Sequence, residues 1–124
     1  MNRHHVVLRS ALPLAAVTRA VNDGYAHLGA HVSAIRSDNP LDEVPDVSVV
    51  GQLIGFARSW AVEAHITDRG DARIVELVAV GDEPLMAAAR LFDRVYSLKK
   101  STEQLERIAA VIRAVDPSCT RVSG

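Results

Sequence analysis

The chain has 124 residues, with 14 Lys and Arg against 15 Asp and Glu, so its formal net charge is −1. This length predicts one domain over residues 1–124, large enough to bury a core without disulfides or a structural metal. A near-neutral charge argues against nucleic acid and anionic membranes as partners, and no run approaches the ~20 apolar residues of a membrane span. The single cysteine, Cys119, favours a reducing, cytoplasmic compartment, and the Ala and Arg bias suggests a bacterial protein.

The first third of the chain predicts a strand, a helix and a weak second strand. The β-branched stretch "HHVVLRS" ends near Ser10, and "AHVSAIRS" alternates weakly after residue 29. Between them, residues 12–28 carry apolar side chains at helical spacing, with Pro13 in the first turn and Gly29 placed as a C-cap. His4 and His5 lie at a terminus that we expect to fray.

Residues 38–46, "DNPLDEVPD", predict a loop because they combine two prolines with four carboxylates. The next segment, 47–58, is ambiguous. As a helix capped by Asp46 it has a continuous apolar stripe; as a strand it has a β-branched start, with Gly51 and Gly55 marking bulges. We favour the helix, because only the helical stripe is continuous.

Residues 59–80 carry the strongest strand signal. "SWAVEAHIT" and "ARIVELVAV" predict two strands joined by "DRGD". The tripeptide Arg69-Gly70-Asp71 resembles a cell-adhesion signal, but Asp and Gly between two β-branched runs are ordinary turn residues. We therefore interpret the tripeptide as a hairpin turn.

The C-terminal third predicts two amphipathic helices, over 84–98 and 102–115. Pro84 suits the first turn of the former, and "STEQ" at 101–104 has the spacing of a capping box that would begin the latter. Because no glycine or proline separates them, one long bent helix is the alternative. Asp116-Pro117 ends the pattern, and Cys119 falls in a polar tail.

The hairpin register decides which side chains meet. If Asp68 pairs with Asp71, the apolar residues share one face and Glu63 lies directly across from Glu76. A three-residue turn would instead set Thr67 against Asp71 and place Glu76 among the apolar residues. Burying an unpaired carboxylate costs a few kcal/mol, whereas turn preferences differ by about one. We therefore expect the first register.

That register predicts the sequence's main catalytic candidates, Glu63, His65 and Glu76. Facing carboxylates repel, so one of them would hold a proton that a nearby imidazole could share. The competing interpretation is a solvated sheet face, which half-exposed antiparallel sheets commonly show.

Other motifs give weaker indications of a metal, cofactor or nucleic-acid site. His27 and His31 have the spacing of helical metal ligands, but Gly29 interrupts the helix and no acidic HExxH pattern is present, so we expect no metal. The sequence has no phosphate-binding glycine loop, so we expect no cofactor. The C-terminal basic residues alternate with acidic ones, as on a solvated helix face.

We therefore predict an α+β fold: an antiparallel sheet centred on a 59–80 hairpin and packed on one face by amphipathic helices 12–28, 84–98 and 102–115. The generous apolar stripes predict a homodimer. The leading functional hypothesis is a non-enzymatic module that binds a small ligand or a protein partner, with Trp60 and Tyr25 as pocket wall. Alternatives are a cofactor-independent isomerase or hydrolase using Glu63, His65 and Glu76, and a nucleic-acid-binding accessory protein.

Overall fold

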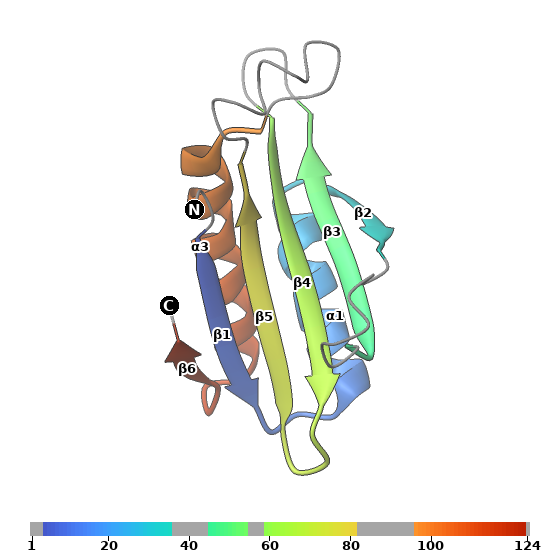
Figure 1. The fold of residues 1–124 in the computed structure, drawn as a ribbon. Helices are drawn as coiled ribbons and strands as arrows, with labels where there is room; N and C mark the ends of the chain where they lie inside the picture. Colours follow the sequence, from blue (N-terminus) through green and yellow to red (C-terminus); the bar gives the residue numbers. More distant parts are fainter. Residues whose placement is uncertain (1–3, 36–44, 55–58, 82–95, 124) are drawn as a thin grey trace.

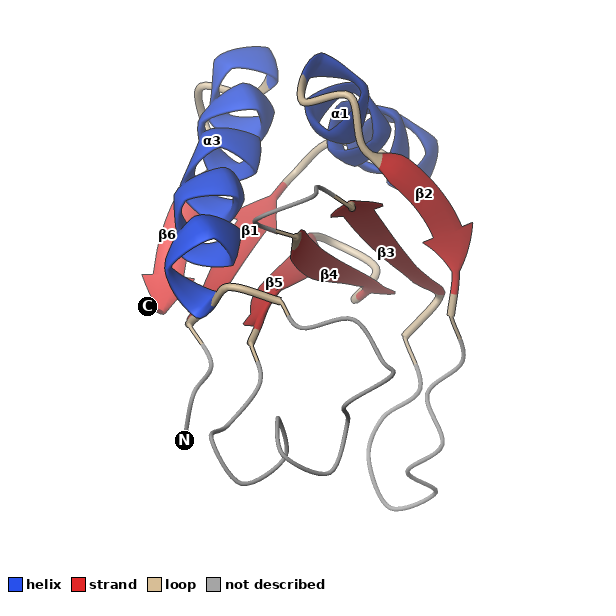
Figure 2. Cartoon of the chain, turned by 90° about the horizontal axis from the view of Figure 1, so that it is seen from above, coloured by secondary structure: helices blue, strands red, loops and turns tan. Residues whose placement is uncertain are grey.

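The fold is a six-stranded antiparallel sheet with two helices on one face, as a computed structural model describes it for residues 4–35, 45–54, 59–81 and 96–123. Figure 1 shows the sheet with both helices behind it, and Figure 2 shows the same two layers from above. The predicted α+β architecture is therefore confirmed. Within the described residues, neither helix is both long and apolar enough to cross a membrane.

The elements follow one another as β1 (His5–Ser10), α1 (Leu14–His27), β2 (His31–Ala34), β3 (Val47–Leu53), β4 (Trp60–Asp68), β5 (Arg73–Val80), α3 (Leu98–Val115) and β6 (Thr120–Ser123). Their order across the sheet is β2-β3-β4-β5-β1-β6. The N-terminal strand thus lies inside the sheet, between β5 and β6, so His5 is held by pairing with Val78 rather than frayed. The polar tail expected around Cys119 in fact leads into an edge strand.

The core lies between the sheet and the helices. Alternate residues of β1, β4 and β5 point into it, because successive side chains of a strand point to opposite faces. Helices α1 and α3 supply the other wall and contact each other closely, since a Cβ on Gly24 would lie 3.2 Å from Cγ2 of Ile108. Among the described residues, the largest fully buried side chains are Trp60, Tyr25, Leu8, Ile66, Leu77, Leu105, Ile108, Ile112, Val6, Val17, Val21 and Val62.

The helix predicted over 12–28 is confirmed as α1, and Gly29 ends it with a φ of 70°, a conformation that glycine adopts without strain. The helix predicted over 102–115 is also confirmed, but it starts at Leu98. The predicted capping box is wrong, because Ser97 is the N-cap and accepts a hydrogen bond from the backbone N–H of Lys100. Ser101 instead accepts one from the N–H of Ala61.

The helix predicted over 84–98 falls mainly outside the described residues; of its range, only 96–98 are described, and Leu98 already belongs to α3.

The helix preferred for 47–58 is wrong over its described part, because Val47–Leu53 forms the strand β3 between β2 and β4. The ring of Tyr25 explains the glycine that made this segment ambiguous. A Cβ on Gly51 would lie only 2.1 Å from Cδ1 of that ring, so the strand needs glycine to let the aromatic side chain pack against its backbone. Residues 55–58 lie outside the described part of the chain.

The predicted hairpin is confirmed, but its register is shifted by two residues. Asp68 pairs with Arg73 rather than Asp71, and a four-residue turn connects the strands. The Asp68 carboxylate accepts hydrogen bonds from the Gly70 N–H at 2.9 Å and from Arg73 at 3.2 Å, which stabilises this longer turn. Because a shift of two preserves the alternation, every side chain stays on its expected face.

Candidate functional site

The candidate site lies on the face of the sheet opposite the helices, called here the open face. Glu63 and His65 reach it from β4, and Glu76 reaches it from β5. The predicted direct pairing of Glu63 with Glu76 is wrong: His65 lies across from Glu76, and Glu63 lies across from Val78. The three predicted catalytic residues nevertheless share one face, because their strand positions have the same alternation.

His65 is held at both ring nitrogens. Its Nε2 lies 3.0 Å from Oε1 of Glu63, and its Nδ1 lies 2.9 Å from Oγ of Ser48 on β3. A carboxylate only accepts hydrogen bonds, so Nε2 carries the proton in a neutral ring and Nδ1 accepts from the Ser48 hydroxyl. The side chain of His65 is only 15% exposed. This imidazole is therefore fixed in place by its own neighbours.

Glu76 is paired with His5, which we expected to lie in a frayed terminus. Nε2 of His5, on the neighbouring strand β1, lies 2.5 Å from Oε2 of Glu76, and both side chains are more than 40% exposed. Within the described residues, the other carboxylate oxygen of Glu76 makes no hydrogen bond. One oxygen of this carboxylate thus remains able to accept a hydrogen bond from a ligand.

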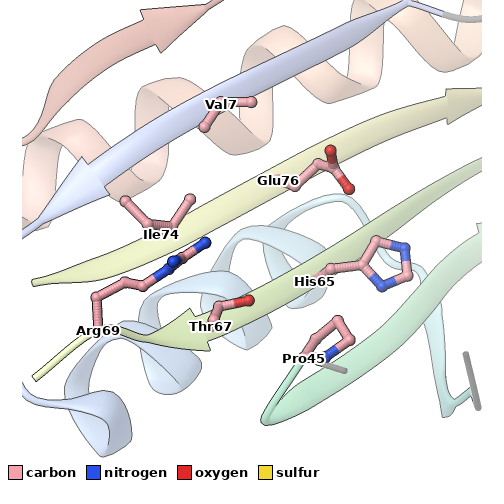
Figure 3. Close-up of a pocket in the computed structure, with 7 residues that line it drawn as sticks. All are labelled: Val7, Pro45, His65, Thr67, Arg69, Ile74 and Glu76. Atoms are coloured by element: carbon pink, nitrogen blue, oxygen red, sulfur yellow. The ribbon is translucent and has the colours of Figure 1, made fainter. Parts of the chain in front are cut away.

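A pocket of about 190 Å³ opens beside this pair (Figure 3). Val7 and Ile74 supply apolar surface from β1 and β5, and Pro45 adds to it from the segment before β3. The polar side chains around the pocket are those of His65, Thr67, Arg69 and Glu76. Pockets for drug-sized ligands usually measure ~300–1,000 Å³, so this one suits a smaller molecule.

Tyr25 and Trp60, predicted as pocket wall, lie on the other side of the sheet. Both are buried in the core, and the Tyr25 hydroxyl donates a 2.6 Å hydrogen bond to the carbonyl of Val62. Burial raises the pKa of this phenol well above its ordinary value. Neither side chain lines the pocket on the open face.

Ser48 and His5, the hydrogen-bond partners of His65 and Glu76, are among the site residues that the sequence did not predict. Ser48 was hidden because its segment was interpreted as a helix, and His5 because strand pairing across 71 residues of sequence leaves no local signal. Strand alternation alone would have placed Ser48 on the face of His65 once β3 was recognised as a strand.

No group of three or more His, Cys, Asp or Glu side chains in the described ranges is arranged to hold a metal ion. His27 and His31, which have helical ligand spacing, lie on either side of the helix end at Gly29 and are both exposed. Cys119 is buried, and burial raises the pKa of its thiol, which disfavours the reactive thiolate.

Comparison with known proteins assigns no family. No family model matches the chain, and no curated protein sequence is significantly similar to it. Functional inference therefore depends on the site geometry.

Proposed function

We propose that this chain is a non-enzymatic binding module that holds a small ligand in the pocket of the open face. The observation that carries the proposal is the pocket itself, in which polar side chains from β4, β5 and their turn surround apolar surface. This combination of apolar lining and few directed polar groups is typical of ligand sites. A pocket this small and exposed suits a bound ligand better than a reaction that requires water to be excluded.

The hydrogen bonds of His65 disfavour direct proton transfer between this ring and a ligand. A histidine takes a proton directly from a ligand only through a nitrogen that the ligand can reach, whereas a histidine held between a carboxylate and a hydroxyl can act only on that hydroxyl. Both nitrogens of His65 already have partners, in Glu63 and Ser48. The arrangement fixes the ring as one wall of the pocket, which favours recognition of a ligand in a single orientation.

A second candidate, a cofactor-independent isomerase or hydrolase, is favoured by one observation: Glu63, His65 and Glu76 share one face. Its weakness is that the backbone of the described strands around His65 offers no free N–H group for developing negative charge. The strand N–H groups around His65 are engaged in ladder pairing with β3 and β5, so they cannot form an oxyanion hole.

Nuclear magnetic resonance with a fragment library tests the binding proposal. We expect fragments to shift the amide signals of His65, Thr67, Ile74 and Glu76 more than those of α1 or α3. The variant Ile74→Trp fills the pocket without changing charge and should abolish these shifts. Val32→Trp, at a 41% exposed position of edge strand β2, is the matched control.

Two results would contradict the proposal. Fragments that perturb only surfaces outside the pocket would assign binding elsewhere. Chemical conversion of a fragment that stops in His65→Gln would instead support the enzyme alternative.

A further inference from the structure

We infer that the edge strand β2 pairs with β2 of a second copy of the chain, which joins two sheets into one continuous antiparallel sheet about a two-fold axis. This inference is independent of the proposed ligand pocket, whose lining comes mainly from β1, β4 and β5. Figures 1 and 2 show β2 at one margin of the sheet. All four of its residues, His31–Ala34, are exposed, so this edge is open to a partner.

The backbone of β2 has unused hydrogen-bonding groups along its outer side. On the inner side, the Ile35 N–H donates to the carbonyl of Ser48 on β3 at 3.0 Å. Opposite residues of antiparallel strands alternate between bonded and non-bonded pairs, so Ser33 also bonds to β3, whereas the N–H and C=O groups of Val32 and Ala34 point outward. No described residue pairs with these four outward groups. Such groups are a template for another strand.

The outward groups of β2 match those of an identical strand turned by 180°. With Ser33 on the two-fold axis, Val32 of each copy lies opposite Ala34 of the other. Each of these two residue pairs then exchanges two N–H···O=C bonds. A second copy therefore satisfies all four outward groups of β2 without a register shift.

The charge of β2 also favours a second copy as the partner. Residues 28–35 contain no Lys, Arg, Asp or Glu, so two copies can align without like charges opposite each other. The other edge strand, β6, carries Arg121, and its pairing with β1 is interrupted by a register shift between Val7 and Leu8. Charged side chains and bulges protect edge strands from pairing. Strand β2 lacks both of these features.

Apolar side chains beside this edge supply further contact. Val32, Leu53 and Ile54 are 41%, 39% and 41% exposed. Val32 and Leu53 lie on the same face of the sheet, because Val32 pairs with Gly51, two residues before Leu53. Pairing with a second copy removes part of the Val32 side chain from water. The paired segment is short, and small interfaces associate weakly, so we expect the dimer to dissociate on dilution.

Analytical ultracentrifugation at increasing protein concentration tests this inference, and we expect a monomer–dimer equilibrium. Val32→Pro removes one outward N–H and leaves the bonds to β3 intact, since proline is tolerated where the N–H of an edge strand faces solvent. Each dimer then loses two hydrogen bonds. The dissociation constant should rise by about tenfold or more.

A charge variant tests the same contact without changing the backbone. Ser33→Lys sets two like charges opposite each other on the two-fold axis and should also raise the dissociation constant about tenfold. The matched control is Thr120→Lys, at an exposed position of the other edge strand, β6, which should leave the dissociation constant unchanged.

A disulfide tests the register. Opposite residues in a non-bonded pair have Cα atoms about 4.5 Å apart, which a disulfide can span. Ser33→Cys should therefore give a disulfide-linked dimer on mild oxidation. Val122→Cys, at a 60% exposed position of β6, should not. The unsubstituted protein should also stay unlinked, because its one cysteine, Cys119, is buried.

Two results would overturn the inference. A monomer at every concentration, with Ser33→Cys linking no faster than Val122→Cys, would leave β2 open to a strand of a different protein. A dimer that Val32→Pro and Ser33→Lys both leave unchanged would mean that the chains associate through another surface.

Discussion

The two faces of the β4–β5 hairpin are built from the same two strands but differ in what surrounds them. On the helix side, Val62, Ala64, Ile66 and Leu77 have no exposed surface. On the open face, Glu63, His65 and Glu76 keep part of theirs. This difference indicates that the buried contacts on the helix side contribute most of the hairpin's stability. The other face can therefore carry polar side chains that are costly to bury and useful for recognition.

The largest expected effect lies on β3, where Gly51 faces the helices and Val50 faces away. In Gly51→Ala the new Cβ would overlap the Tyr25 ring, which must leave its site and give up its hydrogen bond to Val62. We expect the free energy of unfolding to fall by about 4 kcal/mol, comparable with deleting a buried aromatic side chain.

Urea denaturation measures this change, with Val50→Ala as the matched control. Val50 is only half-buried, so its truncation should cost about 1 kcal/mol. If Gly51→Ala and Val50→Ala lowered the free energy of unfolding equally, the Tyr25 ring would not be packed against Gly51 as described.

A second comparison concerns β5, where Leu77 and Ile74 point to opposite faces. Leu77→Ala leaves a cavity in a fully buried site, and we expect a loss of about 3 kcal/mol. Ile74→Ala should cost about 1 kcal/mol, because its side chain is already partly in contact with water at the pocket. Thermal and urea unfolding of both variants would measure the two losses in the free energy of unfolding. A larger loss for Ile74→Ala than for Leu77→Ala would mean that Ile74, not Leu77, faces the core.

The third and smallest effect tests a polar contact on the buried side. The Ser10 hydroxyl, at the end of β1, donates a 2.6 Å hydrogen bond to the buried carboxylate of Asp116, at the end of α3. This bond, with a second from Ser118, holds the pKa of Asp116 below its ordinary value. A carboxylate whose pKa is lower in the folded state stabilises the fold above its unfolded pKa, and that stabilisation is lost as pH falls through the folded value.

Ser10→Ala should therefore lower the free energy of unfolding by about 1.5 kcal/mol at pH 7. The difference from the unsubstituted protein should shrink as pH falls below about 4, where the carboxylate begins to take up a proton in the unfolded chain. Unfolding measured from pH 7 to pH 2 checks this, with Ser33→Ala on the exposed strand β2 as control. A difference that does not change with pH would show that the ionised carboxylate is not involved.

Much of the fold could be predicted because it is encoded locally. The apolar spacing that predicted the helix over 12–28 and the alternation that predicted the hairpin depend only on neighbours in sequence, and both are confirmed. The position of Ser97 as N-cap was missed because two serines, Ser97 and Ser101, both precede helix-compatible residues. Ser101 lies inside the helix, where its hydroxyl accepts a hydrogen bond from the Ala61 N–H on β4.

The candidate site was predicted in part. The cost of burying a carboxylate correctly predicted that Glu63, His65 and Glu76 share one face. Registers that differ by two residues bury the same side chains, so the burial cost cannot distinguish between them. The turn decided between them, because the Asp68 carboxylate stabilises a four-residue connection and thereby places His65, not Glu63, opposite Glu76.

The sequence by itself determined the fold class, the hairpin and the separation of its apolar and polar faces, because each follows from the periodicity of adjacent residues. Only the tertiary structure decided that 47–53 is a strand, since that depends on its pairing with β2 and β4 and on a tyrosine 26 positions away packing against Gly51. The same holds for the pocket. Its residues come from β1, β4, β5 and the segment before β3, and their meeting depends on contacts between segments far apart in the chain.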